Sequence, residues 1–117
     1  MQYAFISQPM KGLTAEEIKD NRESVENFLK SLGYGIVDTV FDFEDIEGIK
    51  NKPLYYLSKA LEKMATEADL VVMLEGYQNA RGCMLELQAA RAYGIPVEYF
   101  CRRDNVSYLR SEWLYET

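Results

Sequence analysis

The segment from Asp69 to Leu74, Asp-Leu-Val-Val-Met-Leu, constrains the fold more than any other stretch of the chain. After the aspartate, every residue in it is apolar. A strand with one solvent-exposed face alternates apolar and polar side chains, whereas a continuous apolar run is typical of a strand buried on both faces. The segment therefore predicts a central strand of a parallel sheet that is covered on both sides.

Three helices are predicted around this strand. Thr14 and Glu17 are spaced as a capping box, and apolar residues recur at helical spacing behind them until Gly33 supplies a stop. A second helix begins near Pro53, which suits a first helical turn. A third runs from about residue 80 to 93 and ends at Gly94.

Short apolar segments at residues 2–7, 34–40 and 95–100 predict three further strands, and residues 41–52 are interpreted as a loop. The tail, residues 101–117, is expected to hold short helical structure. Strands that alternate with helices indicate an α/β fold with a parallel sheet between two helical layers. A chain of 117 residues fits one domain, residues 1–117.

Composition excludes several functions. Thirteen basic and nineteen acidic side chains give a net charge of −6, so duplex nucleic acid is not an expected partner. Two cysteines and no histidine argue against a disulfide framework or a metal site, and no cofactor is expected. We expect a cytoplasmic chain with no membrane partner, because no leader pattern or membrane-spanning apolar run is visible.

The third predicted helix carries the most informative pair of residues, Gly82 and Glu86. Helical side chains tilt toward the N-terminus, so Glu86 leans over the turn that contains Gly82, where no side chain intervenes. A ligand reaching this backbone would meet the carboxylate, and the free N–H groups of the first turn are expected to favour its ionised form. The alternative is a glutamate that faces solvent or pairs with Arg81 or Lys63.

An ionised carboxylate facing a ligand can attack an anomeric carbon and form a glycosyl-enzyme intermediate. In parallel α/β sheets, ligands bind beyond the carboxyl ends of the strands. This rule directs attention to the loops after the first and third predicted strands, Ser-Gln-Pro-Met-Lys-Gly and Glu-Gly-Tyr-Gln-Asn-Ala-Arg-Gly.

These two loops, with the apolar strand and the Gly82–Glu86 helix, resemble the nucleoside 2-deoxyribosyltransferase-like superfamily, particularly its small bacterial and phage branch of uncharacterised proteins. The resemblance covers most of the first 100 residues. It implies a single compact flavodoxin-like or Rossmann-like three-layer α/β sandwich. It also implies cleavage or base exchange at the N-glycosidic bond of a (deoxy)nucleoside or nucleoside 5′-monophosphate.

The resemblance assigns roles residue by residue. Glu86 matches the nucleophile, and Ser7, Gln8 and Met10 would line the base pocket. The sugar or its 5′ substituent would be surrounded by Asn79, Arg81 and Gly82. Tyr77 and Glu75, or a residue from a neighbouring subunit, are candidates for protonating the leaving base.

Two departures from the superfamily pattern keep an alternative open. Ala60 stands where its enzymes commonly have an aspartate, and Ala80 stands where they often have Ser or Asp. Glu62, the nearest carboxylate to Ala60, would lie about 200 degrees around the helix from it and is a poor substitute. The alternative is a nucleotide-binding or sensing module of the same fold that lacks turnover.

The apolar tail also allows two interpretations. Tyr108, Leu109, Trp113, Leu114 and Tyr115 place much apolar area near the end of the chain. They pack either on their own domain or on a second copy, and superfamily members assemble as dimers or larger. We expect a homo-oligomer.

Overall fold

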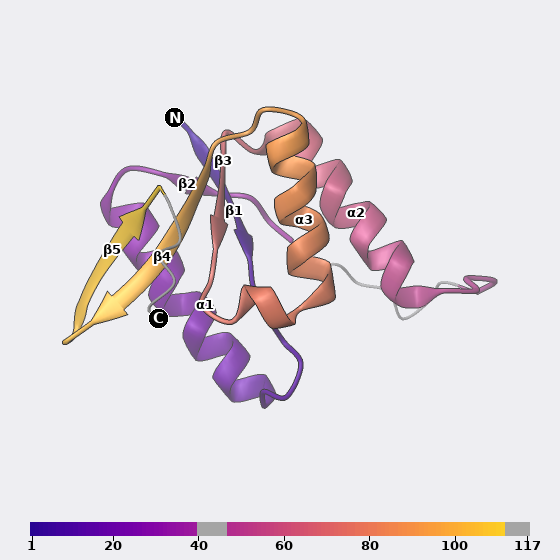
Figure 1. The fold of residues 1–117 in the computed structure, drawn as a ribbon, viewed down its shortest axis with the longest axis horizontal. Helices are drawn as coiled ribbons and strands as arrows, with labels where there is room; N and C mark the ends of the chain where they lie inside the picture. Colours follow the sequence, from indigo (N-terminus) through magenta and orange to yellow (C-terminus); the bar gives the residue numbers. More distant parts are fainter. Residues whose placement is uncertain (40–46, 112–117) are drawn as a thin grey trace.

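The computed structural model describes residues 1–39 and 47–111 and shows an α/β fold (Figure 1). Its elements follow the predicted order up to the fourth strand. They are β1 (Tyr3–Ser7), α1 (Ala15–Ser31), β2 (Gly35–Ile36), α2 (Lys52–Glu67), β3 (Leu70–Met73), the 3-10 turn η1 (Tyr77–Asn79), α3 (Arg81–Ala92), β4 (Val97–Arg103) and β5 (Val106–Arg110).

The strands form one sheet in the order β2-β1-β3-β4-β5. β1 pairs in parallel with β2 and β3, and β3 pairs in parallel with β4. All four residues of β3 are buried, and the strand lies in the middle of the sheet. The prediction drawn from its continuous apolar run is confirmed.

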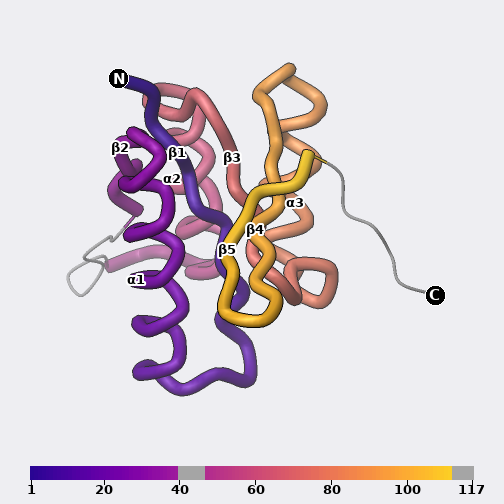
Figure 2. Tube along the Cα trace, turned by 90° about the vertical axis from the view of Figure 1, so that its left-hand side faces the viewer, coloured from indigo at the N-terminus to yellow at the C-terminus, as the bar shows by residue number. Residues whose placement is uncertain are grey.

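Helices cover both faces of the sheet, as predicted. On one face, Val25 and Leu29 of α1 pack against Ile6, Val72 and Phe100. On the other, Met64 of α2 and Leu87 of α3 belong to a core cluster with Phe5, Val71 and Tyr99. Figure 2 shows α1 and α3 on opposite sides of the strands. Because side chains alternate along a strand, neighbouring β1 residues belong to different cores.

The predicted helix ends are confirmed. The Thr14 hydroxyl accepts from the Glu17 backbone N–H, and the Glu17 carboxylate accepts from the Thr14 N–H. Gly33, just past α1, has φ of +92°, a conformation that favours glycine. Asp69 anchors the start of the sheet, since its carboxylate accepts from the Tyr3 N–H at 2.8 Å.

The prediction of short helical structure in the tail is wrong for its described part. β4 continues to Arg103, and β5 returns antiparallel to it through Asp104 and Asn105. Both turn residues have positive φ, 52° and 64°, which is typical of a tight hairpin. The sheet is therefore parallel only as far as β4. Trp113, Leu114 and Tyr115 lie outside the described residues.

The second strand is shorter than predicted. Gly35 and Ile36 are its residues paired with β1, and just beyond them the Val37 N–H donates to the Ala4 carbonyl of β1 at 2.9 Å. Residues 40–46, which include most of the predicted loop, lie outside the described part of the chain. Among the described helices, none combines the length and apolar character needed to cross a membrane.

Candidate functional site

The strand order creates a crevice at the carboxyl ends of β1 and β3. The chain leaves β1 toward α1 on one face, and it leaves β3 through η1 toward α3 on the other. Neighbouring parallel strands whose connections diverge in this way form the usual ligand site of open α/β sheets. The two loops singled out in the sequence therefore lie at the same edge of the sheet.

Glu86 and Ser7 meet on the α3 side of this crevice. The Ser7 hydroxyl, at the last position of β1, donates a hydrogen bond to Glu86 Oε1 at 2.7 Å. Ser7 is only 1% exposed, whereas Glu86 is partly exposed. The carboxyl group is thus held by a buried partner in a residue that is itself only partly exposed.

Burial raises the pKa of Glu86 to about 7, and the Ser7 hydrogen bond opposes this rise. The sequence led us to expect that the first-turn N–H groups of α3 would favour the ionised form. The net shift is in the other direction, because loss of water around the carboxylate is its largest cause and Glu86 lies beyond the first turn of α3. The carboxyl therefore titrates near neutral pH.

Cys83 completes this cluster. Its side chain is buried one turn before Glu86, beside Ser7. Burial raises the pKa of the Cys83 thiol to about 11; the Ser7 contact lowers it and the Glu86 charge raises it further. Cys83 is therefore a neutral thiol at ordinary pH.

The first turn of α3 is open. No side chain of the described residues caps its N-terminus, and Asn79, Arg81 and Gly82 are exposed there. A Cβ at Gly82 would meet no atom of the described residues within 4 Å outside its own turn of helix. Gly82 also has no positive φ. Internal packing therefore does not require glycine at this position.

Tyr77 and Met10, two other predicted site residues, lie in contrasting surroundings. Tyr77 is 3% exposed, and its ring is 5.5 Å from that of Tyr99 in the core. Met10 is 62% exposed, in the loop after β1.

Gln8 and Glu75 lie on the other side of the crevice, in an open cavity of about 130 Å³ that we call the α1 cavity. The Gln8 side-chain amide donates to the Ile18 carbonyl of α1 at 2.7 Å. The lining includes neither Ser7, Gly82 nor Glu86. The predicted site residues therefore fall into two groups, one on each face of the sheet.

The α1 cavity also involves residues that the sequence had not suggested. Asn21 of α1 and Arg102 of β4 contribute to its lining. Arg102 lies in the segment interpreted as a helical tail, so its strand position was not foreseen. The turn-forming pair Asp104 and Asn105 was the available indication of a hairpin.

The two departures from the superfamily pattern are part of the core. Ala60 of α2 and Ala80, the N-cap of α3, pack against the cluster on the α3 side of the sheet. Their methyl groups supply no hydrogen-bonding atom. Glu62 is exposed and pairs with Lys59 at 3.7 Å.

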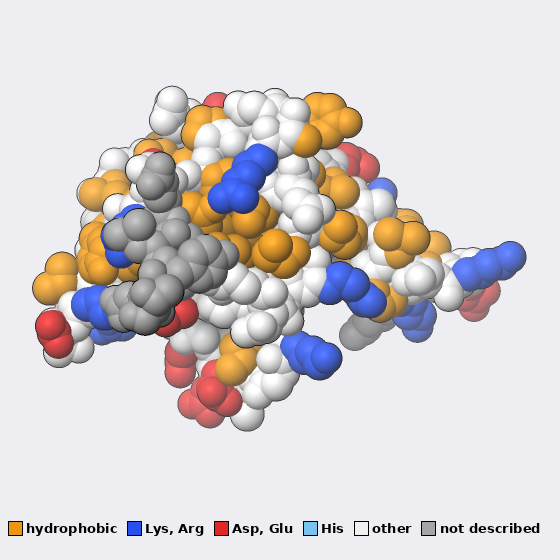
Figure 3. Space-filling model, in the orientation of Figure 1, with side chains coloured by type: hydrophobic (Ala, Val, Ile, Leu, Met, Phe, Trp, Pro, Cys, Tyr) orange, Lys and Arg blue, Asp and Glu red, His pale blue; other side chains and the backbone are white. Residues whose placement is uncertain are grey.

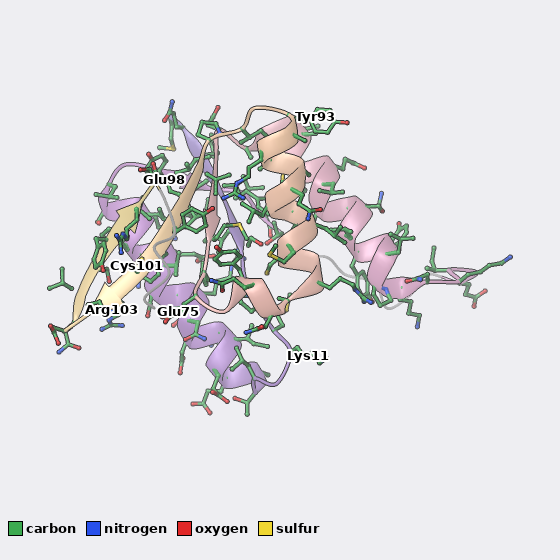
Figure 4. The ribbon with its side chains drawn as sticks, in the orientation of Figure 1. Lys11, Glu75, Tyr93, Glu98, Cys101 and Arg103 are labelled. Atoms are coloured by element: carbon green, nitrogen blue, oxygen red, sulfur yellow. The ribbon has the colours of Figure 1, made fainter. Side chains whose placement is uncertain are left out.

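Lys63, one of the alternative partners considered for Glu86, forms an ion pair with another carboxylate. Lys63 pairs with Glu67 at 3.0 Å, which raises the pKa of the lysine. Glu75 pairs with Arg103 at 3.8 Å, and Figure 4 shows both residues at this edge of the sheet. Among the described residues, no cluster of three or more cysteines and carboxylates could hold a metal ion.

A family model described as "Domain of unknown function (DUF4406)" matches residues 2–99, which include β1, β3 and α3. Comparison with curated proteins gives no match.

Proposed function

The chain belongs to the DUF4406 family, and we propose that it cleaves or exchanges the N-glycosidic bond of a (deoxy)nucleoside or nucleoside 5′-monophosphate. The proposal includes kinship with the nucleoside 2-deoxyribosyltransferase-like superfamily. The observation that carries it is the Glu86 carboxyl, held by Ser7 and one turn from the open backbone at Gly82.

In the proposed reaction, Glu86 Oε2 attacks the anomeric carbon while Ser7 holds Oε1. The bond between C1′ and the base nitrogen breaks, and the base leaves with the electron pair and takes up a proton. Water, or a second base, then attacks C1′ and releases the carboxylate. The first step requires the ionised form of Glu86, so its rate is expected to rise with pH across the carboxyl pKa of about 7.

Gly82 supports this assignment because it makes the helix less stable than alanine would. The difference is roughly 0.5–1 kcal/mol, and no contact inside the described protein requires a residue without a side chain at this position. A ligand lying against the first turn of α3 would explain it. Asn79 and Arg81 flank this turn and suit the polar sugar or a 5′-phosphate.

Protonation of the leaving base is assigned to a residue from a second copy in preference to Glu75 and Tyr77. Glu75 lines the α1 cavity, on the opposite face of the sheet from Glu86, and the Tyr77 ring is packed against Tyr99 in the core.

The test is incubation of the purified chain with each deoxynucleoside and its 5′-monophosphate, with and without a different free base. Released or exchanged base is followed by chromatography. We expect Glu86→Gln to lower the rate by at least about a thousandfold, because the nucleophile is lost. Glu62→Gln, which removes an exposed carboxylate of α2, should keep the wild-type rate. Wild-type turnover by Glu86→Gln would refute the mechanism.

A second candidate function is a nucleotide-binding module without turnover. Ala60 and Ala80 favour it, because both positions lack the polar groups common in superfamily enzymes. This function predicts that nucleotides raise the melting temperature while no base is released. Absence of both product and melting shift would eliminate it.

A further inference from the structure

The α1 cavity is lined by charges of both signs above an apolar floor. Val25, Leu74 and Phe100, all less than 10% exposed, contribute the floor, and Glu75 and Arg102 contribute the charges. The Phe100 ring is fixed by Phe28 of α1, with ring centroids 5.6 Å apart. The cavity thus combines a rigid apolar surface with polar groups that can orient a ligand.

Its size limits the ligand. At about 130 Å³ the cavity is well below the roughly 300 Å³ at which pockets for drug-sized molecules begin. It has room for a single ring system, while a larger ligand would extend through its open side into solvent.

The polar groups of the α1 cavity remain largely free for a ligand. Gln8 uses its amide N–H on the Ile18 carbonyl, which leaves its own carbonyl oxygen as an acceptor. Glu75 has a long ion pair of 3.8 Å with Arg103, and 64% of its side chain is exposed. Within residues 1–39 and 47–111, the Arg102 guanidinium has no hydrogen-bond or ion-pair partner.

A ligand that satisfies these groups needs paired N–H donors for a carboxylate and a nearby acceptor for a guanidinium. Guanine has both, since its N1–H and N2 amino group lie side by side and its O6 and N7 are acceptors that arginine binds well. Adenine presents an unprotonated ring nitrogen where guanine presents N1–H, and this nitrogen would face the Glu75 carboxylate.

We propose that the α1 cavity binds a guanine-type base, with Glu75 facing the N1–H and N2 amino donors and Arg102 facing the ring acceptors. The site lies on the opposite face of the sheet from Glu86. It therefore goes beyond the proposed glycosidic chemistry, and it holds whether or not the chain breaks a bond.

The test uses 9-methylguanine, which has no sugar and so cannot be cleaved. It is titrated into the ¹⁵N-labelled wild-type chain, and shifts of the Gln8 and Asn21 side-chain amide signals are followed. We expect saturable shifts there and at least tenfold weaker binding of 9-methyladenine. Arg102→Gln and Glu75→Gln should each weaken 9-methylguanine binding at least tenfold. Glu23→Gln, an exposed carboxylate of α1, is the matched control and should bind normally.

Three results would overturn the proposal: equal binding of the two methylated bases, saturable binding of leucine in their place, or shifts confined to the first turn of α3. A second titration with guanosine 5′-monophosphate distinguishes two forms of the ligand. If it binds more weakly than 9-methylguanine, the ligand is the free base. If it binds equally or more tightly, the ligand is the nucleotide. None of these titrations depends on turnover. Absence of base binding in the α1 cavity would therefore not refute the glycosidic proposal, and absence of turnover in the Glu86 assay would not refute base binding in the α1 cavity.

Discussion

Ser7 and Gln8 are neighbours in the chain, yet their side chains lie in two different sites. Ser7 points toward α3 and holds the Glu86 carboxyl, while Gln8 points toward α1 and lines the α1 cavity. On the α3 side the carboxyl is desolvated and its pKa is about 7. On the α1 side the Glu75 carboxylate is largely exposed. Strand alternation therefore builds two chemically distinct environments at one strand end.

The largest expected effect is a pH dependence of the free energy of unfolding that comes from Glu86. An unfolded glutamate ionises near pH 4.5, whereas folded Glu86 stays protonated until about pH 7, so the folded state binds more protons in between. Stability should therefore fall as pH rises from about 4.5 to 7 and then level off. The loss amounts to about 3 kcal/mol. Glu86→Gln should remove this loss, as measured by urea unfolding at pH 5 and pH 8.

Ser7→Ala is expected to have the next largest effect. It removes a hydrogen bond to a partly buried carboxylate, which costs about 1–3 kcal/mol at pH 8, where Glu86 is ionised. The pKa of Glu86 should rise further, because the Ser7 bond lowers it. Carbon NMR of the Glu86 carboxyl would report this pKa directly. Ser24→Ala on exposed α1 should change neither quantity, and an unchanged Glu86 pKa in Ser7→Ala would contradict the assigned contact.

Gly82→Ala should stabilise the protein by up to about 1 kcal/mol and reduce ligand binding at the same time. The added methyl group meets open space in the described protein but would occupy the position proposed for the sugar. Thermal unfolding measures the gain in stability, and the chromatographic assay measures the loss of activity that follows from weaker ligand binding. A more stable variant with full activity would show that no ligand approaches the first turn of α3.

The smallest expected effect is on the α1 side. Glu75→Gln removes one exposed member of a long ion pair, so the free energy of unfolding should change by less than about 0.5 kcal/mol. Glu86→Gln, the same chemical change, should alter the free energy of unfolding strongly and in a way that depends on pH. If the two substitutions gave equal unfolding curves from pH 5 to 8, the contrast between the two sites would be wrong.

The fold was predictable where local signals were strong. The buried run of β3, the capping box at Thr14 and the glycine after α1 each depend on nearby residues, and the structure confirms them. The β5 hairpin was missed because charged residues broke up the strand pattern, although Asp104 and Asn105 suit a hairpin turn. Cross-strand pairing, rather than local preference, decides the structure of that segment.

The site was predictable only in part. Spacing placed Glu86 one turn after Gly82, but the link to Ser7 depends on how β1 lies against β3 and α3. The raised pKa of Glu86 depends on burial, which spacing cannot supply. Substrate contacts by Ser7, Met10, Asn79 and Arg81 remain predictions, as does the homo-oligomer. Leu85 of α3 and Tyr93, its C-cap, are exposed apolar side chains, and the face drawn in Figure 3 carries several apolar groups.

The hydrogen bond between Ser7 and Glu86 joins residues 79 positions apart. Closing so long a loop is costly in chain entropy, and parallel strands must wait for their crossover helices. The Glu86 carboxyl therefore acquires its neutral-range titration only after β1, β3 and α3 have assembled. In a partly folded chain it would titrate as an ordinary glutamate. Its protonation near pH 6 is consequently a natural reporter of how much of the population has completed folding.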